Sequence, residues 1–122
     1  MKVPDLNDRI AAHARAVIAG DDATAEAFVG SASLAAWRAA CASIRGQYPL
    51  RDFELIACAK IGMQYMAKTR FHGARGVSTL LIRWKKLDGT WTIAGAEDIT
   101  GKRSPWSDIQ HYSRESGGRP DA

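Results

Sequence analysis

Three side chains in this sequence are of types that could transfer a proton or bind a small molecule: His13, Tyr65 and Glu97. A carboxylate that lies against apolar residues has a raised pKa, which suits it to donate or accept a proton. An imidazole can act as an acid, a base or a hydrogen-bond donor, and a phenol can donate to a ligand oxygen. These residue types indicate proton transfer, of the isomerase or dehydratase kind.

Each of the three also has a structural explanation. Glu97 could pair with a basic residue such as Arg103, since structural ion pairs also perturb pKa values. His13 shares the apolar stripe of a predicted helix with Ile10, where a hydrogen-bonded core histidine is the alternative. Tyr65 could be an aromatic core residue. The residue types alone therefore leave both explanations open.

The sequence indicates neither a metal site nor a cofactor. Cys41 and Cys58 are the two cysteines, and they lack both CxxC spacing and the histidine spacing of a zinc site. His13, His72 and His111 show no metal-ligand spacing with one another. We expect two reduced thiols, no metal and no cofactor.

Length and composition favour one domain. The chain has 122 residues, of which 46% are apolar and 25% charged, as is usual for a globular protein. We expect a single domain over residues 1–112 and a flexible tail over 113–122, because no large apolar residue follows Ser113. No stretch approaches the roughly 20 apolar residues that span a bilayer, and residues 1–10 lack the pattern of a secretory signal. The expected location is the cytoplasm, away from membranes.

The net charge of +4 is unevenly distributed. Residues 60–103 contain nine Lys or Arg against Asp88, Glu97 and Asp98. A basic sheet could bind nucleic acid, but no base-stacking aromatics alternate with these charges. The pattern favours a solvated strand face over a nucleic-acid partner.

The apolar periodicity changes once along the chain. Helical spacing predicts one helix that Asp5 caps and Gly20 ends, and a short second helix that Asp21 or Asp22 caps and that runs to residue 29. It predicts a third helix that contains Leu34 and Ile44 and ends at Gly46. Strand-like alternation then predicts strands at 53–61, 65–72, 77–87 and 90–99, joined by hairpins. The order predicts an α+β domain with three N-terminal helices packed on a curved four-stranded antiparallel sheet.

Side-chain alternation and loop lengths predict the strand register. A two-residue Asp88-Gly89 turn joins the last two strands, a four-residue loop at 73–76 the middle two, and a three-residue loop at 62–64 the first two. The three predicted rows facing the helices are Ile61, Tyr65, Trp84 and Ile93; Ala59, Ala67, Ile82 and Gly95; and Ala57, Thr69, Leu80 and Glu97.

The middle row is mostly small, and small residues on a curved sheet leave volume that a ligand can fill. We therefore expect a mostly apolar cleft between the first helix and the sheet. Glu97 and His13 are the candidate catalytic residues. The candidate ligand-binding residues are Tyr65, Ala67, Thr69, Leu80, Ile82 and Gly95.

The opposite face of the predicted sheet mixes basic and apolar side chains. It is too apolar to be simply solvated, and a self-complementary patch with a charged rim is typical of a homodimer interface. The apolar residues expected at this interface are Ile56, Cys58, Met66 and Leu81.

Helices followed by a hairpin-rich sheet that carries Leu81-Ile82-Arg83-Trp84 and then Asp88-Gly89-Thr90-Trp91-Thr92-Ile93 resemble the nuclear transport factor 2-like superfamily over about residues 5–100. This superfamily includes ketosteroid isomerase and the polyketide cyclases that resemble it. The resemblance implies a cone-shaped, cystatin-like fold that dimerises through its sheet and holds a ligand between sheet and helices. The tyrosine donor and early-strand aspartate of the isomerase have no residue-for-residue match here, so no catalytic residue is transferred.

Two functions remain open at this point. One is a small-molecule-binding domain, with or without proton-transfer catalysis by Glu97 and His13. The other is a non-enzymatic homodimeric protein-interaction module. A fold-level resemblance does not choose between them, because unrelated functions share folds.

Overall fold

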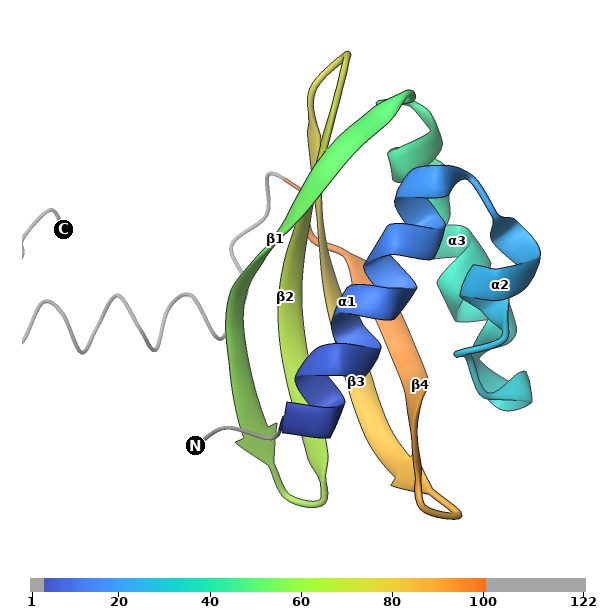
Figure 1. Cartoon of the computed structure of the whole chain (residues 1–122), viewed down its shortest axis with the longest axis vertical. Helices are drawn as coiled ribbons and strands as arrows, with labels where there is room; N and C mark the ends of the chain where they lie inside the picture. Colours follow the sequence, from blue (N-terminus) through green and yellow to red (C-terminus); the bar gives the residue numbers. More distant parts are fainter. Residues whose placement is uncertain (1–3, 101–122) are drawn as a thin grey trace, which may run out of the picture.

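A computed structural model describes residues 4–100 of the chain. Within that range, three α-helices precede four strands, and the helices lie on one side of the sheet (Figure 1). The sheet is antiparallel and open, with the order β1-β2-β3-β4. The predicted α+β class is confirmed, and the predicted tail, 113–122, lies outside the described residues. The elements are α1 Pro4–Ala19, α2 Asp22–Glu26, α3 Leu34–Arg45, β1 Leu50–Ile61, β2 Gln64–Gly73, β3 Val77–Leu87 and β4 Thr90–Asp98.

Helix α1 follows the predicted apolar stripe, since Leu6, Ile10 and Val17 are all buried. Gly20 ends the helix with a φ of 74°, a left-handed conformation that glycine adopts without steric cost. Asp5 lies inside the first turn and is therefore not the predicted N-cap. Its Oδ2 accepts a hydrogen bond from Trp91 Nε1 at 3.2 Å, which joins the start of α1 to β4.

Helix α2 is shorter than predicted. Asp21 is its N-cap and accepts from the backbone N–H of Thr24 at 3.2 Å, but the helix ends at Glu26 rather than at Val29. The chain after α2 pairs with the edge of β4 instead: Ile93 donates to Phe28 O at 2.8 Å, and Gly30 donates to Ile93 O at 3.0 Å. These tertiary hydrogen bonds outweigh the helical tendency of a short alanine-rich segment.

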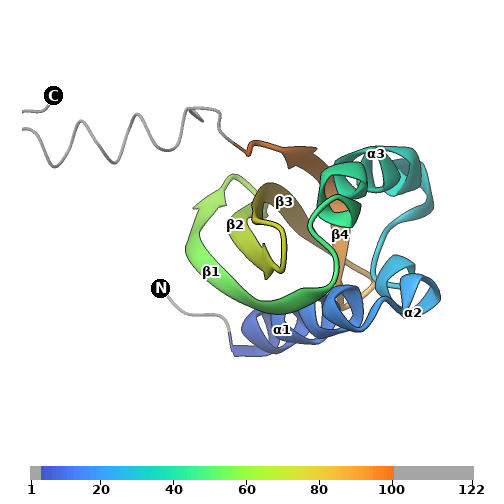
Figure 2. The ribbon, with the colours of Figure 1, turned by 90° about the horizontal axis from the view of Figure 1, so that it is seen from above.

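Helix α3 has the expected buried stripe of Trp37, Cys41 and Ile44, with Leu34 half-buried beside it. A short 3₁₀ turn, Ser31–Ser33, leads into it, and Gly46 follows its last residue. Viewed from above, the sheet is strongly curved, with α1 alongside β1 and α3 alongside β4 (Figure 2). The buried core residues lie between the helices and this curved sheet.

The predicted pairing of β2 with β3 is confirmed. Tyr65 lies opposite Trp84, Ala67 opposite Ile82 and Thr69 opposite Leu80. On β2 the alternation is regular: Ala67 and Thr69 are buried, and Met66 and Lys68, which alternate with them, are partly exposed. These two central strands fix which side chains face the helices, a side that we call the inner face.

The predicted pairing of β3 with β4 is right at Trp84 and Ile93 and wrong beyond them. A bulge adds one residue to β4, so Ile82 lies opposite Ala96 rather than Gly95, and Leu80 lies opposite Asp98 rather than Glu97. Side-chain parity cannot reveal an inserted residue, because every position after the bulge exchanges faces. Gly95 and Glu97 therefore belong to the outer face, away from the helices.

The predicted pairing of β1 with β2 is also wrong by one residue. The connection contains two residues rather than three, because Ile61 pairs with Gln64 across Gly62 and Met63. Cys58 lies opposite Ala67 and Lys60 opposite Tyr65, so the inner-face positions predicted for Ala57, Ala59 and Ile61 are wrong, as is the outer-face position predicted for Cys58. A second bulge, between Leu55 and Ala57, places Ile56 outside the regular pairing.

Candidate functional site

His13 is a buried titratable side chain, which α1 places among aromatic rings. His13 is 1% exposed. Its ring centroid lies 4.6 Å from that of Trp37 on α3, 5.5 Å from Phe28 and 5.8 Å from Trp84 on β3, and all three contacts are edge-to-face. The predicted place of His13 on the apolar stripe of this helix is confirmed by its burial. Its predicted catalytic role stays a prediction.

Burial keeps the His13 imidazole neutral. Desolvation, with a smaller contribution from the Arg9 charge, lowers the pKa of His13 to about 3. Arg9 itself lies with its guanidinium 4.3 Å from the centre of the Phe28 ring and donates to Trp91 O at 3.1 Å. At neutral pH the interior at His13 therefore holds a neutral ring that can form hydrogen bonds.

Three buried polar atoms have no hydrogen-bond partner among the residues that the structure describes: His13 Nε2, Trp84 Nε1 and Thr69 Oγ1. Leaving such a group unbonded costs about 1–3 kcal/mol, and most buried polar groups in proteins are bonded. His13 and Trp84 are ring neighbours, whereas Thr69 lies two rows further along the inner face. Because each of the three residues is at most 1% exposed, an uncharged molecule reaches these atoms only if the packing around them opens.

Sequence reasoning missed Trp84 as a candidate. The predicted row that contains Trp84 also contains Ile61, Tyr65 and Ile93, which are all bulky, and Trp84 is 0% exposed in the structure. The chemistry of the side chain could have identified it, because a buried indole N–H needs an acceptor and the predicted row contains only Tyr65 as a polar neighbour. Tyr65 instead packs edge-to-face against Trp91, at 5.4 Å between centroids.

The structure brings five of the six predicted ligand-binding residues to the inner face. Ala67, Leu80, Ile82 and Thr69 are at most 1% exposed, and Tyr65 is half-buried. The sixth, Gly95, lies on the outer face opposite Arg83, so its predicted position is wrong. A Cβ on Gly95 would lie 2.6 Å from an Arg83 guanidinium nitrogen, which explains why glycine suits this position.

Glu97 does not lie beside the interior. It pairs with Leu81, is exposed, and lines an outer groove of about 300 Å³. The predicted proximity of Glu97 to His13 and the cleft is therefore wrong, because the bulge reverses its face. Its proposed alternative partner, Arg103, lies outside the described residues. The full lining of the groove is Met66, Leu81, Arg83, Gly95, Ala96 and Glu97.

Asp98 takes the inner-row position that the sequence assigned to Glu97. It lies opposite Leu80 and is half-buried at the end of β4. Its Oδ1 accepts from the backbone N–H of Thr100 at 3.0 Å, and Thr100 Oγ1 in turn accepts from the Thr79 N–H at 2.9 Å. These bonds tie the strand end to β3 and give Asp98 a structural role.

A second groove, of about 430 Å³, lies between the first half of α1 and the turn before β4. Asp5 and Asp8 line it together with Trp91. Lys86 Nζ lies 3.5 Å from Asp5 and 5.4 Å from the Trp91 ring centre, so this groove already contains its own cation. Asp5 is therefore already paired with a cation.

The described residues include no group of three or more His, Cys, Asp or Glu placed to hold a metal ion. Cys41 is buried, and burial raises the pKa of its thiol to about 12, so it stays protonated. Cys58 is a free, exposed thiol. Among helices in the same range, none has the length and apolar character to cross a bilayer.

The chain matches no family model, and comparisons with curated proteins and with solved structures give no significant match.

Proposed function

We propose that this domain binds a small, largely apolar molecule in the interior between α1 and the inner face of the sheet. The observation that carries the proposal is the set of buried polar atoms without partners, on residues that are otherwise surrounded by apolar side chains. A ligand that bonds to them removes a cost of about 1–3 kcal/mol each. Such a molecule stabilises the folded chain.

The nuclear transport factor 2-like resemblance belongs to this proposal. It implies a cystatin-like cone with a ligand between helices and sheet. Two observations agree with that arrangement: the helices lie on one side of a curved sheet, and the predicted ligand-binding residues of β2 and β3 lie on the same side (Figure 1). In such a site His13 and Trp84 provide the polar contacts.

Proton-transfer catalysis, if it occurs here, falls to His13 rather than to Glu97. Glu97 lies on the outer face, and Asp98 is bonded to Thr100. A neutral imidazole with a pKa of about 3 is a weak base, and its main capacity is to form a hydrogen bond. We therefore propose binding as the primary function of the site.

The experiment is a thermal-denaturation screen of the unchanged chain against steroid-like and polyketide-like compounds. A ligand that binds only the folded state at a hundredfold excess over its Kd adds about 2.7 kcal/mol of stability, which raises the Tm by several degrees. Hits are repeated on Trp84→Phe, with Trp91→Phe as the matched control, because the Trp91 indole already donates to Asp5. The proposal fails if no compound raises the Tm.

The second candidate function is a homodimeric interaction module that uses the outer face. The observation in its favour is the outer groove, where Met66 and Leu81 form an apolar floor and Arg83 and Glu97 provide opposite charges. Neither charge forms an ion pair within residues 4–100. A two-fold axis would bring Arg83 of one copy to Glu97 of the other.

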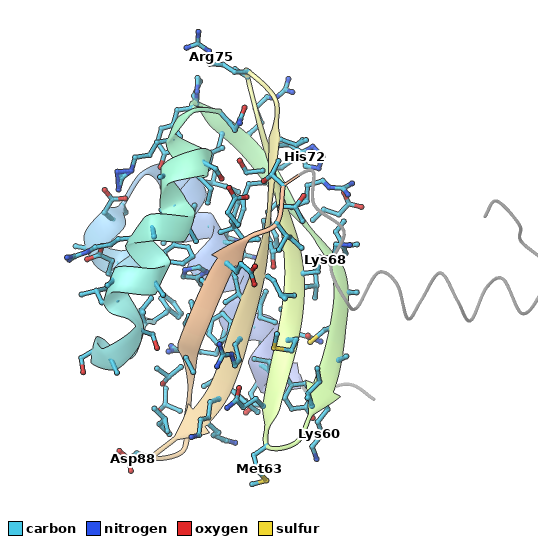
Figure 3. The ribbon with its side chains drawn as sticks, turned by 180° about the vertical axis from the view of Figure 1, so that it is seen from behind. Lys60, Met63, Lys68, His72, Arg75 and Asp88 are labelled. Atoms are coloured by element: carbon cyan, nitrogen blue, oxygen red, sulfur yellow. The ribbon has the colours of Figure 1, made fainter. Side chains whose placement is uncertain are left out.

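The outer face also carries many charges that a dimer would have to accommodate. Figure 3 shows this face with Lys68 and His72 on β2, and with Met63 and Asp88 at the hairpin end of the sheet. Sedimentation equilibrium tests the candidate. A dimer that Leu81→Lys dissociates while Leu87→Lys leaves it intact supports it, because Leu87 is exposed near the turn, outside the groove. A monomer at all concentrations refutes it.

A further inference from the structure

The outer groove lies on the side of the sheet that faces away from the helices, and most of its residues occupy two adjacent rows. In one row Arg83 on β3 lies between Met66 on β2 and Gly95 on β4. In the next row Leu81 lies opposite Glu97. The volume of the groove is about 300 Å³, which is at the lower end of the range for small-molecule sites. The groove is therefore large enough for a small molecule.

Gly95 allows the Arg83 side chain to lie across β4. A Cβ on Gly95 would be 2.6 Å from a terminal guanidinium nitrogen of Arg83 and 2.9 Å from its Cζ. Any other residue at position 95 would displace the guanidinium, because two atoms cannot approach so closely. The positive charge of Arg83 thus lies against the backbone of β4, in the groove.

Glu97 is the next outer-face residue of β4 after Gly95. Two residues of a strand span roughly 7 Å, so the guanidinium and the Glu97 side chain occupy neighbouring positions along β4. Neither of them forms an ion pair within residues 4–100. Met66 and Leu81 form the apolar floor beside them. The groove therefore offers a cation, an anion and an apolar surface at three separate places.

A free amino acid with an aliphatic side chain carries the complementary groups. Its carboxylate and its ammonium are bonded to one carbon, and with a charge-assisted hydrogen bond at either end they bridge a gap of roughly 7–8 Å. We propose that the outer groove binds such an amino acid, with its carboxylate on Arg83, its ammonium on Glu97 and its aliphatic side chain on Met66 and Leu81.

The pair of opposite charges disfavours ligands that carry one kind of charge. A phosphate or a dicarboxylate is attracted by Arg83 but repelled by Glu97, and a polyamine has the opposite problem. The inference does not depend on the interior ligand, because the groove lies on the other face of the sheet. A two-fold dimer would use the same groove, so it competes with the amino acid.

The test uses L-leucine and three probes that each lack one of its features. Isoamylamine lacks the carboxylate, isocaproate lacks the ammonium, and glycine lacks the aliphatic side chain. Each is titrated at neutral pH into the ¹⁵N-labelled unchanged chain, and the backbone amide signals of Gly95 and Glu97 are followed. An exposed ion pair changes an affinity by up to about fivefold. We expect leucine to shift both signals and to bind up to about fivefold tighter than isoamylamine or isocaproate, and also tighter than glycine.

Two variants assign the charges. Arg83→Gln removes the partner of the carboxylate, so leucine and isoamylamine should bind equally well. Glu97→Gln removes the partner of the ammonium, so leucine and isocaproate should bind equally well. Lys85→Gln and Glu54→Gln are the matched controls, because both residues are exposed charges of the sheet outside the groove, and each should keep the preference for leucine.

Different failures have different meanings. If isoamylamine or isocaproate binds the unchanged chain as tightly as leucine, the groove does not recognise both charges and the inference is overturned. It is also overturned if leucine shifts neither signal, and a dimer that Leu81→Lys dissociates then identifies a second copy as the occupant. The interior site is tested separately by the thermal-denaturation screen, and none of these results changes its outcome.

Discussion

On the inner face of the sheet the polar side chains are few and buried, and two of them have no partner within residues 4–100, whereas on the outer face charged side chains are common and reach water. Trp84 and Thr69 represent the first situation, with unbonded atoms at 0% and 1% exposure. His72 and Glu54 represent the second, since they meet at 3.3 Å while both remain partly exposed. Water completes the hydrogen bonds of the outer face, but the inner face needs a ligand or a bound water to do so.

The largest difference between the two faces is expected in the loss of stability when either of two neighbouring leucines is replaced by alanine. Leu80 points inward and is 0% exposed, and Leu81 points outward and is half-buried. We expect Leu80→Ala to cost about 2–5 kcal/mol because it removes core contacts and leaves a cavity, and Leu81→Ala about 0.5–1 kcal/mol. Urea denaturation monitored by tryptophan fluorescence measures both. Equal costs would mean that the outer face is also buried in solution, as in a dimer.

Alanine substitutions at two buried glycines should differ less in their effect on stability. A Cβ on Gly73 would collide with the backbone carbonyl of Gln47, which cannot move easily, whereas a Cβ on Gly95 would meet the end of the flexible Arg83 side chain. We expect Gly73→Ala to lower the free energy of unfolding by about 1–3 kcal/mol and Gly95→Ala by under about 1 kcal/mol. Thermal denaturation of both variants tests this. A larger loss at Gly95 would show that Arg83 is fixed in place.

Acid should lower the stability of the folded chain through His13. Its folded-state pKa is about 3, well below the usual histidine value of about 6.5. As pH falls below about 6.5, the unfolded chain binds a proton that the folded chain does not, so stability present above that pH is lost. We expect a loss of up to about 1.4 kcal/mol per pH unit below pH 6.5.

The control for this pH dependence is a pair of histidine variants. His13→Gln should remove most of the slope between pH 6.5 and 5.5, and His72→Gln should keep it, because that variant leaves the buried imidazole of His13 in place. Denaturant titrations at each pH provide the slopes. If His13→Gln leaves the slope unchanged, the imidazole is not buried as a neutral ring.

The smallest loss of stability is expected when an ion pair at the surface is removed. Arg38 donates to both carboxylate oxygens of Glu26 at 2.8 Å, and the guanidinium lowers the pKa of that carboxyl. The pair lies at the surface, so Arg38→Gln should cost much less stability than Leu80→Ala, and less still at high salt. Denaturation at low and high salt measures this. A cost as large as that of Leu80→Ala would contradict the contrast between solvated and buried regions.

The amino-acid sequence predicted the order of elements and the central pairing of β2 with β3, because periodicity and turn residues act locally. It misplaced Gly95, Glu97 and Cys58 because bulges and a shorter loop reverse faces without changing the apolar pattern. His13 was found from its place on a helical stripe. Trp84 was not predicted as a candidate, because the absence of an acceptor for its indole N–H can be recognised only when its neighbours in the fold are known.

The most direct test of the interior site is an electron-density map of crystals soaked with a compound that raises the Tm. We expect the compound between α1 and the sheet, with a hydrogen-bond acceptor about 3 Å from Trp84 Nε1. Density that shows no compound there, with His13 Nε2 and Trp84 Nε1 both bonded to protein groups or to water, would contradict the account.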